Sequence, residues 1–362
     1  MPFLRLAVDA SVVAEDTRGI GRYARAVLRR LIAHDDVDLI LLLRGPFAFR
    51  HRTALERALG SSRFSLRSSP GLRSDADVIW HPANGTFFAS HLPSVATIHD
   101  AVPFRYPDDD PKRRLHAQKP FLESVRTASR IVAVSEFGRE ELRAVFNLDR
   151  ERIAVIHHGV EQSFAPGPAR PLPSGLFDQR YILFVGDPIA EPRKNFALLY
   201  EAYRRAWPSR GKTGAASSVP ALVVAGAQAP PLEGVVHAGN LGDDLAARNA
   251  DEGLRALYRG ALVLALASYH ETFGMPMLEA MACGTPVVAS RASSLPEIGG
   301  DAALYAPPND PDAWATALRR VTEDFTLRDR LRIVGLDRAT HFSWDESAAR
   351  HLALFREIAA TS

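Results

Sequence analysis

The stretch "ALVLALASYHETFGMPMLEAMACGTPVVAS" (residues 261–290) contains a complete strand–helix–strand unit. Its first seven residues are apolar, as expected of a strand that is buried on both faces. A loop follows, Pro276 starts a short helix over 276–283, and Gly284 is a candidate cap at the end of that helix. The apolar run 285–290 is the next strand. This order of strand, helix and strand predicts a parallel sheet covered by helices.

The same alternation extends over nearly the whole chain and defines the fold class. We expect further strands at 4–10, 37–43, 77–81, 94–100, 130–135, 152–158, 181–186 and 221–226. Helical patterns lie at 20–33, 111–129, 136–147, 194–206, 252–259 and 344–360, the last preceded by Ser343 as a candidate N-cap. The chain is therefore predicted to be α/β, with two Rossmann-like doubly wound parallel-sheet domains.

The domain boundary is predicted from length and from proline content. A chain of 362 residues exceeds what one hydrophobic core usually holds, and residues 163–175 contain four prolines. We expect an N-terminal domain over 1–165, a linker over 166–176 and a C-terminal domain over 177–343. The last helix, within 344–362, has no pattern that assigns it, and packing back on the N-terminal domain is one option. Ligands of such sheets bind beyond the carboxyl ends of the strands, so two facing domains would form a binding cleft.

Composition excludes several classes of protein. The hydrophobic share of 46% and charged share of 24% are typical of a soluble globular chain, and no apolar run is long enough to span a membrane. Cys283 is the only cysteine, which excludes a disulfide framework, and no signal peptide is recognisable, so we expect a cytoplasmic protein. Residues 1–74 hold 13 arginines against 7 acidic residues. A solvated surface is the simpler interpretation, and peripheral contact with an anionic membrane at the inner face is the other. Nucleic acid is not expected as a partner.

Two groups of residues in the C-terminal half suit a ligand that carries both phosphates and hydroxyls. "EPRKNF" (191–196) follows a strand, and Asn195 is a candidate N-cap of the helix behind it. Arg193 and Lys194 beside a helix start would form an anion site. Glu271 and Glu279 stand eight residues apart, and Pro276 prevents one continuous helix, so one should lie in a loop and the other on the following helix. Their carboxylates would accept hydrogen bonds from sugar or ribose hydroxyls.

The other candidate motifs are either rejected or retained only in part. "GIGRYA" (19–24) matches a dinucleotide fingerprint but lies too far behind its strand, so only a glycine-rich turn at Gly19 and Gly21 before a helix is retained, as a candidate anion site. "GKT" (211–213) lacks the glycine and the strand of a phosphate loop. His157 and His158 lack a third ligand, and we expect no metal. A glycosidase carboxylate pair is disfavoured by the neighbouring cations. His99, at a strand end beside Asp100, is a candidate site residue or a structural histidine.

With these motifs in order, the sequence resembles the family 4 glycosyltransferases, which have the two-domain GT-B fold. The resemblance covers nearly the whole chain. It rests on "RGIGRYA" (18–24), "TIHDAVPFRYP" (97–107), "IVAVSEFGREEL" (131–142), "VIHHGV" (155–160), "GDPIAEPRKN" (186–195), "HETFGMPMLEAMACGTPVVAS" (270–290) and "LPEIGGDAALYAPPND" (295–310). Two glutamates separated by seven residues are the hallmark of that family.

The resemblance implies a retaining, metal-independent transfer from a nucleotide-sugar, with no cofactor. By this resemblance, Arg193 and Lys194 would neutralise the diphosphate and assist departure of the nucleotide, and Glu279 would hold the ribose. Glu271 would hold hydroxyls of the donor sugar near the backbone amides of Phe273, Gly274 and Met275, and His99 would lie near the transferred sugar. Gly19 and Gly21 would let the N-terminal loop approach the phosphates. The leaving phosphate would accept the proton of the acceptor.

The donor and the acceptor are the least specific part of the prediction. The motif variants look most like bacterial mannosyltransferases of lipopolysaccharide and capsule assembly, so GDP-mannose is the leading donor and UDP- or dTDP-sugars are the alternatives. A saccharide or a polyprenyl-diphosphate-linked acceptor would be the partner. A nucleotide-sugar epimerase and a catalytically silent nucleotide-binding protein remain open.

Overall fold

The computed structural model describes residues 3–15, 19–45, 48–68, 75–87, 90–168, 180–208, 219–239 and 250–361. The chain divides into two compact units, the first comprising Met1–Gly159 with Ser343–Ser362 and the second comprising Val160–Phe342. This division lies a few residues before the expected domain end at 165. Residues 169–176 of the expected linker, and the rejected "GKT" loop, lie outside the described residues.

Unit 1 is built on a parallel sheet with the strand order β3-β2-β1-β4-β5-β6-β7. Its strands are β1 (Leu4–Asp9), β2 (Val37–Leu43), β3 (Ser65–Ser68), β4 (Val78–His81), β5 (Ser94–Ile98), β6 (Arg130–Ala133) and β7 (Ile153–Val155). The chain runs outward from β1 to β3 and then returns to build β4 to β7 on the other side. This is the doubly wound arrangement that the alternating sequence predicts.

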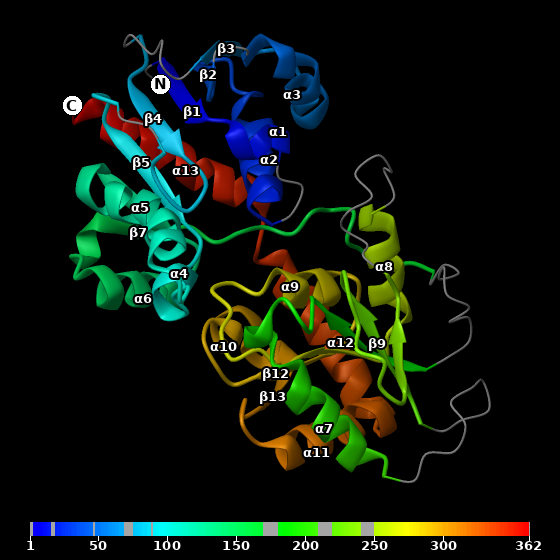
Figure 1. The fold of residues 1–362 in the computed structure, drawn as a ribbon. Coiled ribbons are helices and arrows are strands. Elements are labelled where there is room, and N and C mark those ends of the chain that lie inside the picture. Colours follow the sequence, from blue (N-terminus) through cyan, green and yellow to red (C-terminus); the bar gives the residue numbers. More distant parts are fainter. Residues whose placement is uncertain are drawn as a thin grey trace. The chain divides into compact units, whose positions relative to one another are not determined.

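The helices of unit 1 cover this sheet (Figure 1). They are α1 (Ser11–Glu15), α2 (Gly19–Leu31), α3 (Arg52–Leu59), α4 (Val102–Arg105), α5 (Pro111–Thr127), α6 (Glu136–Phe146) and α13 (Trp344–Ala360), with 3₁₀ turns η1 (Ala48–His51) and η3 (Arg150–Arg152). The C-terminal helix α13 packs on α2, β1 and β4, and it therefore belongs to unit 1. Ser343 caps it as expected, because its side chain accepts hydrogen bonds from the amides of Asp345 and Glu346.

Unit 2 contains a second parallel sheet with the order β10-β9-β8-β11-β12-β13. Its strands are β8 (Tyr181–Val185), β9 (Ala221–Ala225), β10 (Val235–His237), β11 (Val263–Leu266), β12 (Val287–Ser290) and β13 (Ala303–Ala306). Its helices are α7 (Phe196–Ala206), α8 (Ala250–Gly260), α9 (Met275–Ala282), α10 (Leu295–Gly299), α11 (Pro311–Glu323) and α12 (Phe325–Thr340), with 3₁₀ turns η4 (Pro192–Lys194) and η5 (Gly300–Ala302). The winding direction changes between β8 and β11.

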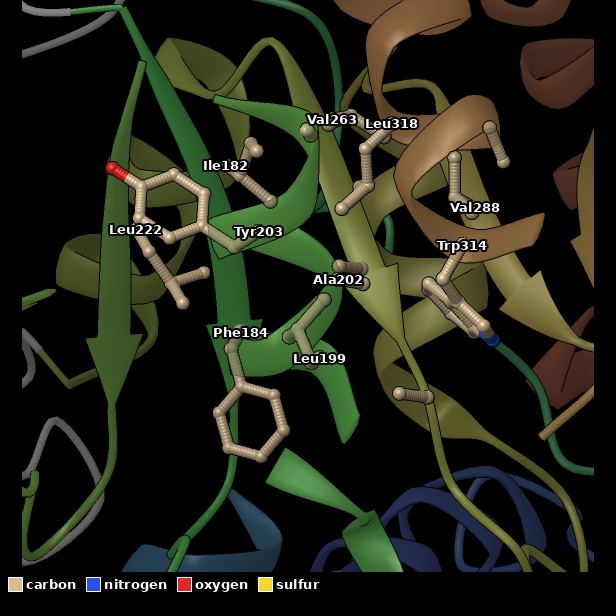
Figure 2. Packing of buried hydrophobic residues seen from close by; sticks show 14 of the residues in the cluster. Ile182, Phe184, Leu199, Ala202, Tyr203, Leu222, Val263, Val288, Trp314 and Leu318 are labelled. Atoms are coloured by element: carbon tan, nitrogen blue, oxygen red, sulfur yellow. The ribbon is translucent and has the colours of Figure 1, made fainter. Parts of the chain in front are cut away.

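A hydrophobic core joins this sheet to α7 and α11 (Figure 2). Leu199 and Tyr203 of α7 and Trp314 of α11 are fully buried in this core. The strands contribute Phe184 and Leu222, which are also buried. Because the core holds α7 against the strands, the loop that leads from β8 into α7 has a defined position.

Strand prediction succeeded where the strand is apolar and failed where it is short and partly exposed. Each expected strand is present, in most cases trimmed by one to four residues, whereas β3, β10 and β13 were not predicted from the sequence. β3 (SLRS) and β10 (VVH) contain only partly buried or exposed residues, so they lack the apolar run that marks the others. No helix in the described ranges is long and apolar enough to cross a membrane.

Candidate functional site

Three neighbouring strands of unit 2 end at one edge of the sheet. The loops after β8, β11 and β12 leave this edge, and β8 and β11 flank the point where the winding direction changes. In open α/β sheets this is where ligands bind. The β8 loop carries Arg193 and Lys194, and the β11 loop carries Glu271.

Glu271 lies at the centre of this edge. It is 8% exposed, and its Oε1 atom accepts hydrogen bonds from the Ser268 hydroxyl at 2.9 Å and from the Lys194 ammonium at 3.3 Å. The guanidinium of Arg193 lies 3.5 Å from its Oε2. As the sequence predicted, Glu271 lies in a loop and Glu279 on the helix that follows. The structure brings the predicted cations and this carboxylate together.

Arg193 and Lys194 come from the 3₁₀ turn η4. Arg193 donates to Glu191 at 2.7 Å and to the carbonyl of His270 at 3.3 Å. The amide of Tyr269 donates to the carbonyl of Arg193 at 2.8 Å, which ties the β8 loop to the β11 loop. Lys194 is buried, and its ammonium carries three N–H donors, of which Glu271 takes one. The remaining donors can serve a phosphate oxygen.

Asn195 occupies the N-cap position of α7, but its expected side-chain cap is wrong. The residue is in the left-handed conformation (φ 58°) and makes no side-chain cap hydrogen bond. Its side-chain amide nitrogen, Nδ2, instead donates to the backbone carbonyls of Ala267 at 3.2 Å and Pro308 at 2.8 Å. The Asn195 side chain thus reaches across the sheet edge rather than along its own helix. It ties the β8 loop to the end of β11.

Charge compensation sets the ionisation of Glu271. Burial by itself would raise the pKa of its carboxyl, but the charges of Lys194 and Arg193 and the hydrogen bond from Ser268 outweigh burial and lower the pKa. Glu271 is therefore a carboxylate at neutral pH. The two cations face two carboxylates, Glu191 and Glu271. An arriving diphosphate would shift this local balance toward negative charge.

The helix α9 begins immediately after this loop, as predicted. Gly274 precedes it with φ 90°, and a Cβ atom there would lie 2.8 Å from Leu295, so only glycine fits without rearrangement. Phe273 is buried and Met275 is the first helical residue. At the other end, Gly284 has φ +79° and its amide donates to Met281, as expected of a glycine cap.

Glu279 lies on α9 and is 2% exposed. Its Oε2 accepts a hydrogen bond from the hydroxyl of Tyr258 at 3.0 Å. The backbone of Tyr258 is in turn held by Thr285, whose hydroxyl donates to its carbonyl at 2.6 Å. The carboxylate is therefore held in place by α8. Its role toward a ribose stays a prediction.

The remaining predicted residues belong to unit 1. Gly19 and Gly21 do not form a turn before the helix, which corrects the sequence prediction: Gly19 is the first residue of α2, and Gly21 is buried within its first turn. The helix starts one residue earlier than the predicted residue 20, and its residues Tyr23 and Ala24 are buried. Within the described part of the chain, no atom lies within 4 Å of the position that a Cβ at Gly19 would occupy.

His99 lies in a buried group of rings at the end of β5. Its Nε2 donates to the carbonyl of Pro82 at 2.8 Å, and its ring meets Tyr23 edge-on with centroids 4.7 Å apart. His158 stacks on Tyr23 with ring centroids 4.9 Å apart and lies 5.4 Å from the His99 ring, and burial lowers the pKa of His158. His99 therefore has a structural environment, and its predicted place near a transferred sugar stays a prediction.

The hydroxyl of Tyr23 connects α2 to the C-terminal helix. Nδ1 of His351 lies 2.7 Å from the carbonyl of Ser347, which can only accept, so Nδ1 carries the proton. Nε2 then accepts from the Tyr23 hydroxyl at 2.6 Å. Burial lowers the pKa of His351 to about 4, which keeps the ring neutral at neutral pH. This hydrogen bond adds a polar contact to the packing of α13 on α2 in unit 1.

Three serines around Glu271 were not predicted as site residues. Ser268 binds its carboxylate, while Ser293 and Ser294 bind its backbone from the β12 loop. Serine is common in loops, and only the fold shows which serines face Glu271. Among the described residues, no group of three or more His, Cys, Asp or Glu side chains is arranged to hold a metal ion. The metal-independent chemistry and the membrane contact stay predictions.

Two family models match this chain, one for each unit. The model described as "Glycosyltransferase Family 4" matches residues 17–164, and that described as "Glycosyl transferases group 1" matches residues 179–324. The chain is 31% identical to the O-antigen chain mannosyltransferase B of Escherichia coli, with 93% of this chain and 96% of that protein covered. It is 29% identical to a D-inositol 3-phosphate glycosyltransferase of a Nocardioides species, covering 69% of this chain and 58% of that protein.

Solved structures share the fold over the full length. Sucrose-phosphate synthase from Thermosynechococcus elongatus has a TM-score of 0.69 at 20% identity, covering 99% of this chain and 100% of its own. HepE from Anabaena, crystallised with UDP and glucose, has a TM-score of 0.67 at 14% identity, covering 98% and 100%. These structures place both units in the GT-B architecture.

Proposed function

Because the chain belongs to the family 4 glycosyltransferases, we propose that it transfers mannose from GDP-mannose to a saccharide or polyprenyl-diphosphate-linked acceptor during assembly of a bacterial surface polysaccharide. The transfer would retain the anomeric configuration and need no metal ion. The choice of mannose is supported by the 31% identity to the O-antigen chain mannosyltransferase B over 93% of this chain.

The observation that carries the proposal is the arrangement of Glu271 with Arg193 and Lys194. A nucleotide-sugar needs cations for its diphosphate and hydrogen-bond acceptors for its sugar within a few ångströms of each other. Here Lys194 lies 3.3 Å and Arg193 lies 3.5 Å from the carboxylate of Glu271, at the sheet edge where ligands bind. The cations would stabilise the charge that develops on the leaving diphosphate, in the manner of a metal ion.

A thermal-unfolding panel tests the donor. It compares GDP, UDP and dTDP and their sugars, including GDP-mannose. A ligand at 100 times its dissociation constant adds about 2.7 kcal/mol of stability, which is roughly 5–10 °C for a unit of this size. We expect guanosine ligands to give the largest shift. A shift with uridine ligands alone would instead assign a UDP-sugar, and the GDP-mannose proposal would be wrong.

The product distinguishes transfer from the alternatives. A transferase consumes GDP-mannose only with an acceptor, an epimerase converts the nucleotide-sugar without one, and a silent binding protein turns nothing over. Two acceptors are worth testing: the lipid-linked saccharide of the proposal, and D-inositol 3-phosphate, which the name of the Nocardioides relative contains. The anomeric configuration of the product, read by NMR, tests retention.

A substitution at Gly186 tests the position of the Lys194 side chain and leaves the charges of Arg193 and Lys194 in the chain. Its φ is +143°, and a Cβ atom there would lie 2.3 Å from Cδ of Lys194. We expect Gly186→Ala to displace the Lys194 side chain and to weaken GDP binding about tenfold or more, since charge-assisted hydrogen bonds are lost. Gly239→Ala is the matched control, because Gly239 has φ +90° but a Cβ atom there would have no atom of the described residues within 4 Å. Unchanged GDP affinity in Gly186→Ala, measured by calorimetry, would contradict the assigned role of Lys194.

A further inference from the structure

Ser293 has a backbone conformation that its residue type rarely adopts. Its φ is +53°, in the left-handed region. The other non-glycine residues with positive φ in the described ranges are all asparagines, Asn84, Asn147 and Asn195, and asparagine tolerates this region better than other side chains. A serine there is strained, because its Cβ atom crowds the backbone in this region. A turn that needed only this φ would be better served by glycine.

The hydroxyl of Ser293 makes a hydrogen bond that glycine at this position could not make. It accepts a hydrogen bond from the amide of Glu271 at 3.0 Å, across 22 residues of chain. The next residue, Ser294, holds the other side of the same backbone. Its hydroxyl and its amide donate to the carbonyl of Glu271 at 2.7 Å and 3.2 Å. The β12 loop thus binds both backbone polar groups of Glu271.

The carboxylate of Glu271 is held separately, by groups from the loops after β8 and β11. Ser268 and Lys194 share its Oε1, and Arg193 approaches its Oε2. The side chain is therefore fixed at its charged end by one set of contacts and at its backbone end by another. Both are needed to aim the remaining acceptor sites of the carboxylate, because a small rotation of the backbone would move the oxygens away from a bound hydroxyl.

From this arrangement we propose that Ser293 is a positioning residue that acts through Glu271 and thereby determines how well the donor sugar, as opposed to the nucleotide, is held. The inference rests on the proposed role of Glu271 toward the sugar. Ser293 would make no contact with the donor itself. Its hydroxyl orients the carboxylate before the donor arrives, and the strain is retained because glycine, which would relieve it, has no hydroxyl.

The test separates sugar binding from nucleotide binding. Ser293→Gly keeps the backbone conformation without strain and removes the hydroxyl, so we expect unchanged or higher thermal stability and unchanged GDP affinity. The ratio of the affinity for GDP-mannose to the affinity for GDP should fall about tenfold in this variant. Its kcat should fall as well. Ser293→Asn should recover much of this loss, because asparagine accepts the same φ and offers an amide oxygen. Ser290→Ala is the control, since the buried Ser290 hydroxyl makes no hydrogen bond to any described residue.

A double-mutant cycle with Glu271→Gln identifies the route of the effect. If Ser293 acts through Glu271, Ser293→Gly adds no further loss of GDP-mannose affinity in the Glu271→Gln background. Equal losses for GDP and GDP-mannose, or additive losses in the double variant, would overturn the proposal. If the wild-type protein responds to another nucleotide-sugar in the thermal panel, the same cycle is run with that pair, so an incorrect donor does not affect the test. A wild-type protein that binds no nucleotide-sugar would refute both the proposed function and this inference.

Discussion

Glu271→Gln is expected to lower kcat about 100- to 1000-fold while GDP binding largely persists, which is the range seen when one preorganised polar group is lost from an active site. Glutamine keeps the size of the side chain and one acceptor oxygen. It removes the negative charge that Lys194 and Arg193 surround. Steady-state kinetics with GDP-mannose and calorimetry with GDP measure the two effects.

The control for this variant is Glu323→Gln in the same unit. Glu323 pairs with Arg319 at 3.2 Å on an exposed face, and both side chains are more than half exposed. We expect no change in kcat there. Turnover by Glu271→Gln that equals that of the wild type would show that the carboxylate has no part in the transfer.

The same variant has a defined pH dependence of stability. The pKa of Glu271 is lowered in the folded protein from an ordinary value of 4.5, so its charge stabilises the fold above that pH. This contribution is lost as the pH falls through the folded pKa. The difference in unfolding free energy between the wild type and Glu271→Gln should therefore be largest near neutral pH and shrink below about pH 4.5. A difference that does not change with pH would contradict the charge compensation described above.

Lys194→Met is expected to weaken GDP binding by about 10- to 150-fold, since hydrogen bonds to charged groups contribute about 1.5–3 kcal/mol. Methionine retains apolar bulk beside Gly186. The variant also leaves Glu271 buried with less compensating charge, so its pKa should rise. The acid limb of the pH–rate profile should then move to higher pH.

A double variant of Lys194 and Glu271 separates the effect of their ion pair on stability from its effect on activity. Removing one partner of a buried ion pair typically costs 3–5 kcal/mol, whereas removing both leaves no uncompensated charge. The double variant Lys194→Met/Glu271→Gln should therefore be more stable than Lys194→Met, while its kcat stays as low as that of Glu271→Gln or lower. Lys119→Met, on the exposed side of α5, is the control for loss of a lysine. GDP binding by Lys194→Met as tight as in the wild type would remove Lys194 from the donor site.

The candidate site residues show how much of the site the sequence pattern predicts. Glu271 and Glu279 were placed correctly in a loop and on a helix because Pro276 and Gly284 mark the ends of α9 along the chain. Asn195 was assigned a cap that it does not form, because its side chain donates to Ala267 and Pro308. These carbonyls belong to other loops, and no local pattern indicates them.

The sequence by itself determined the alternation of strands and helices, the class of the fold and the segments that carry the chemistry, because apolar runs, prolines and glycines act on the chain locally. Only the tertiary structure decided which strands are neighbours, and therefore that the loops after β8, β11 and β12 meet at Glu271. It also decided that α13 completes unit 1 and that Ser293 holds a backbone amide 22 residues away. These contacts depend on the order of strands in the sheet, which is set by the packing of the whole unit rather than by any one segment.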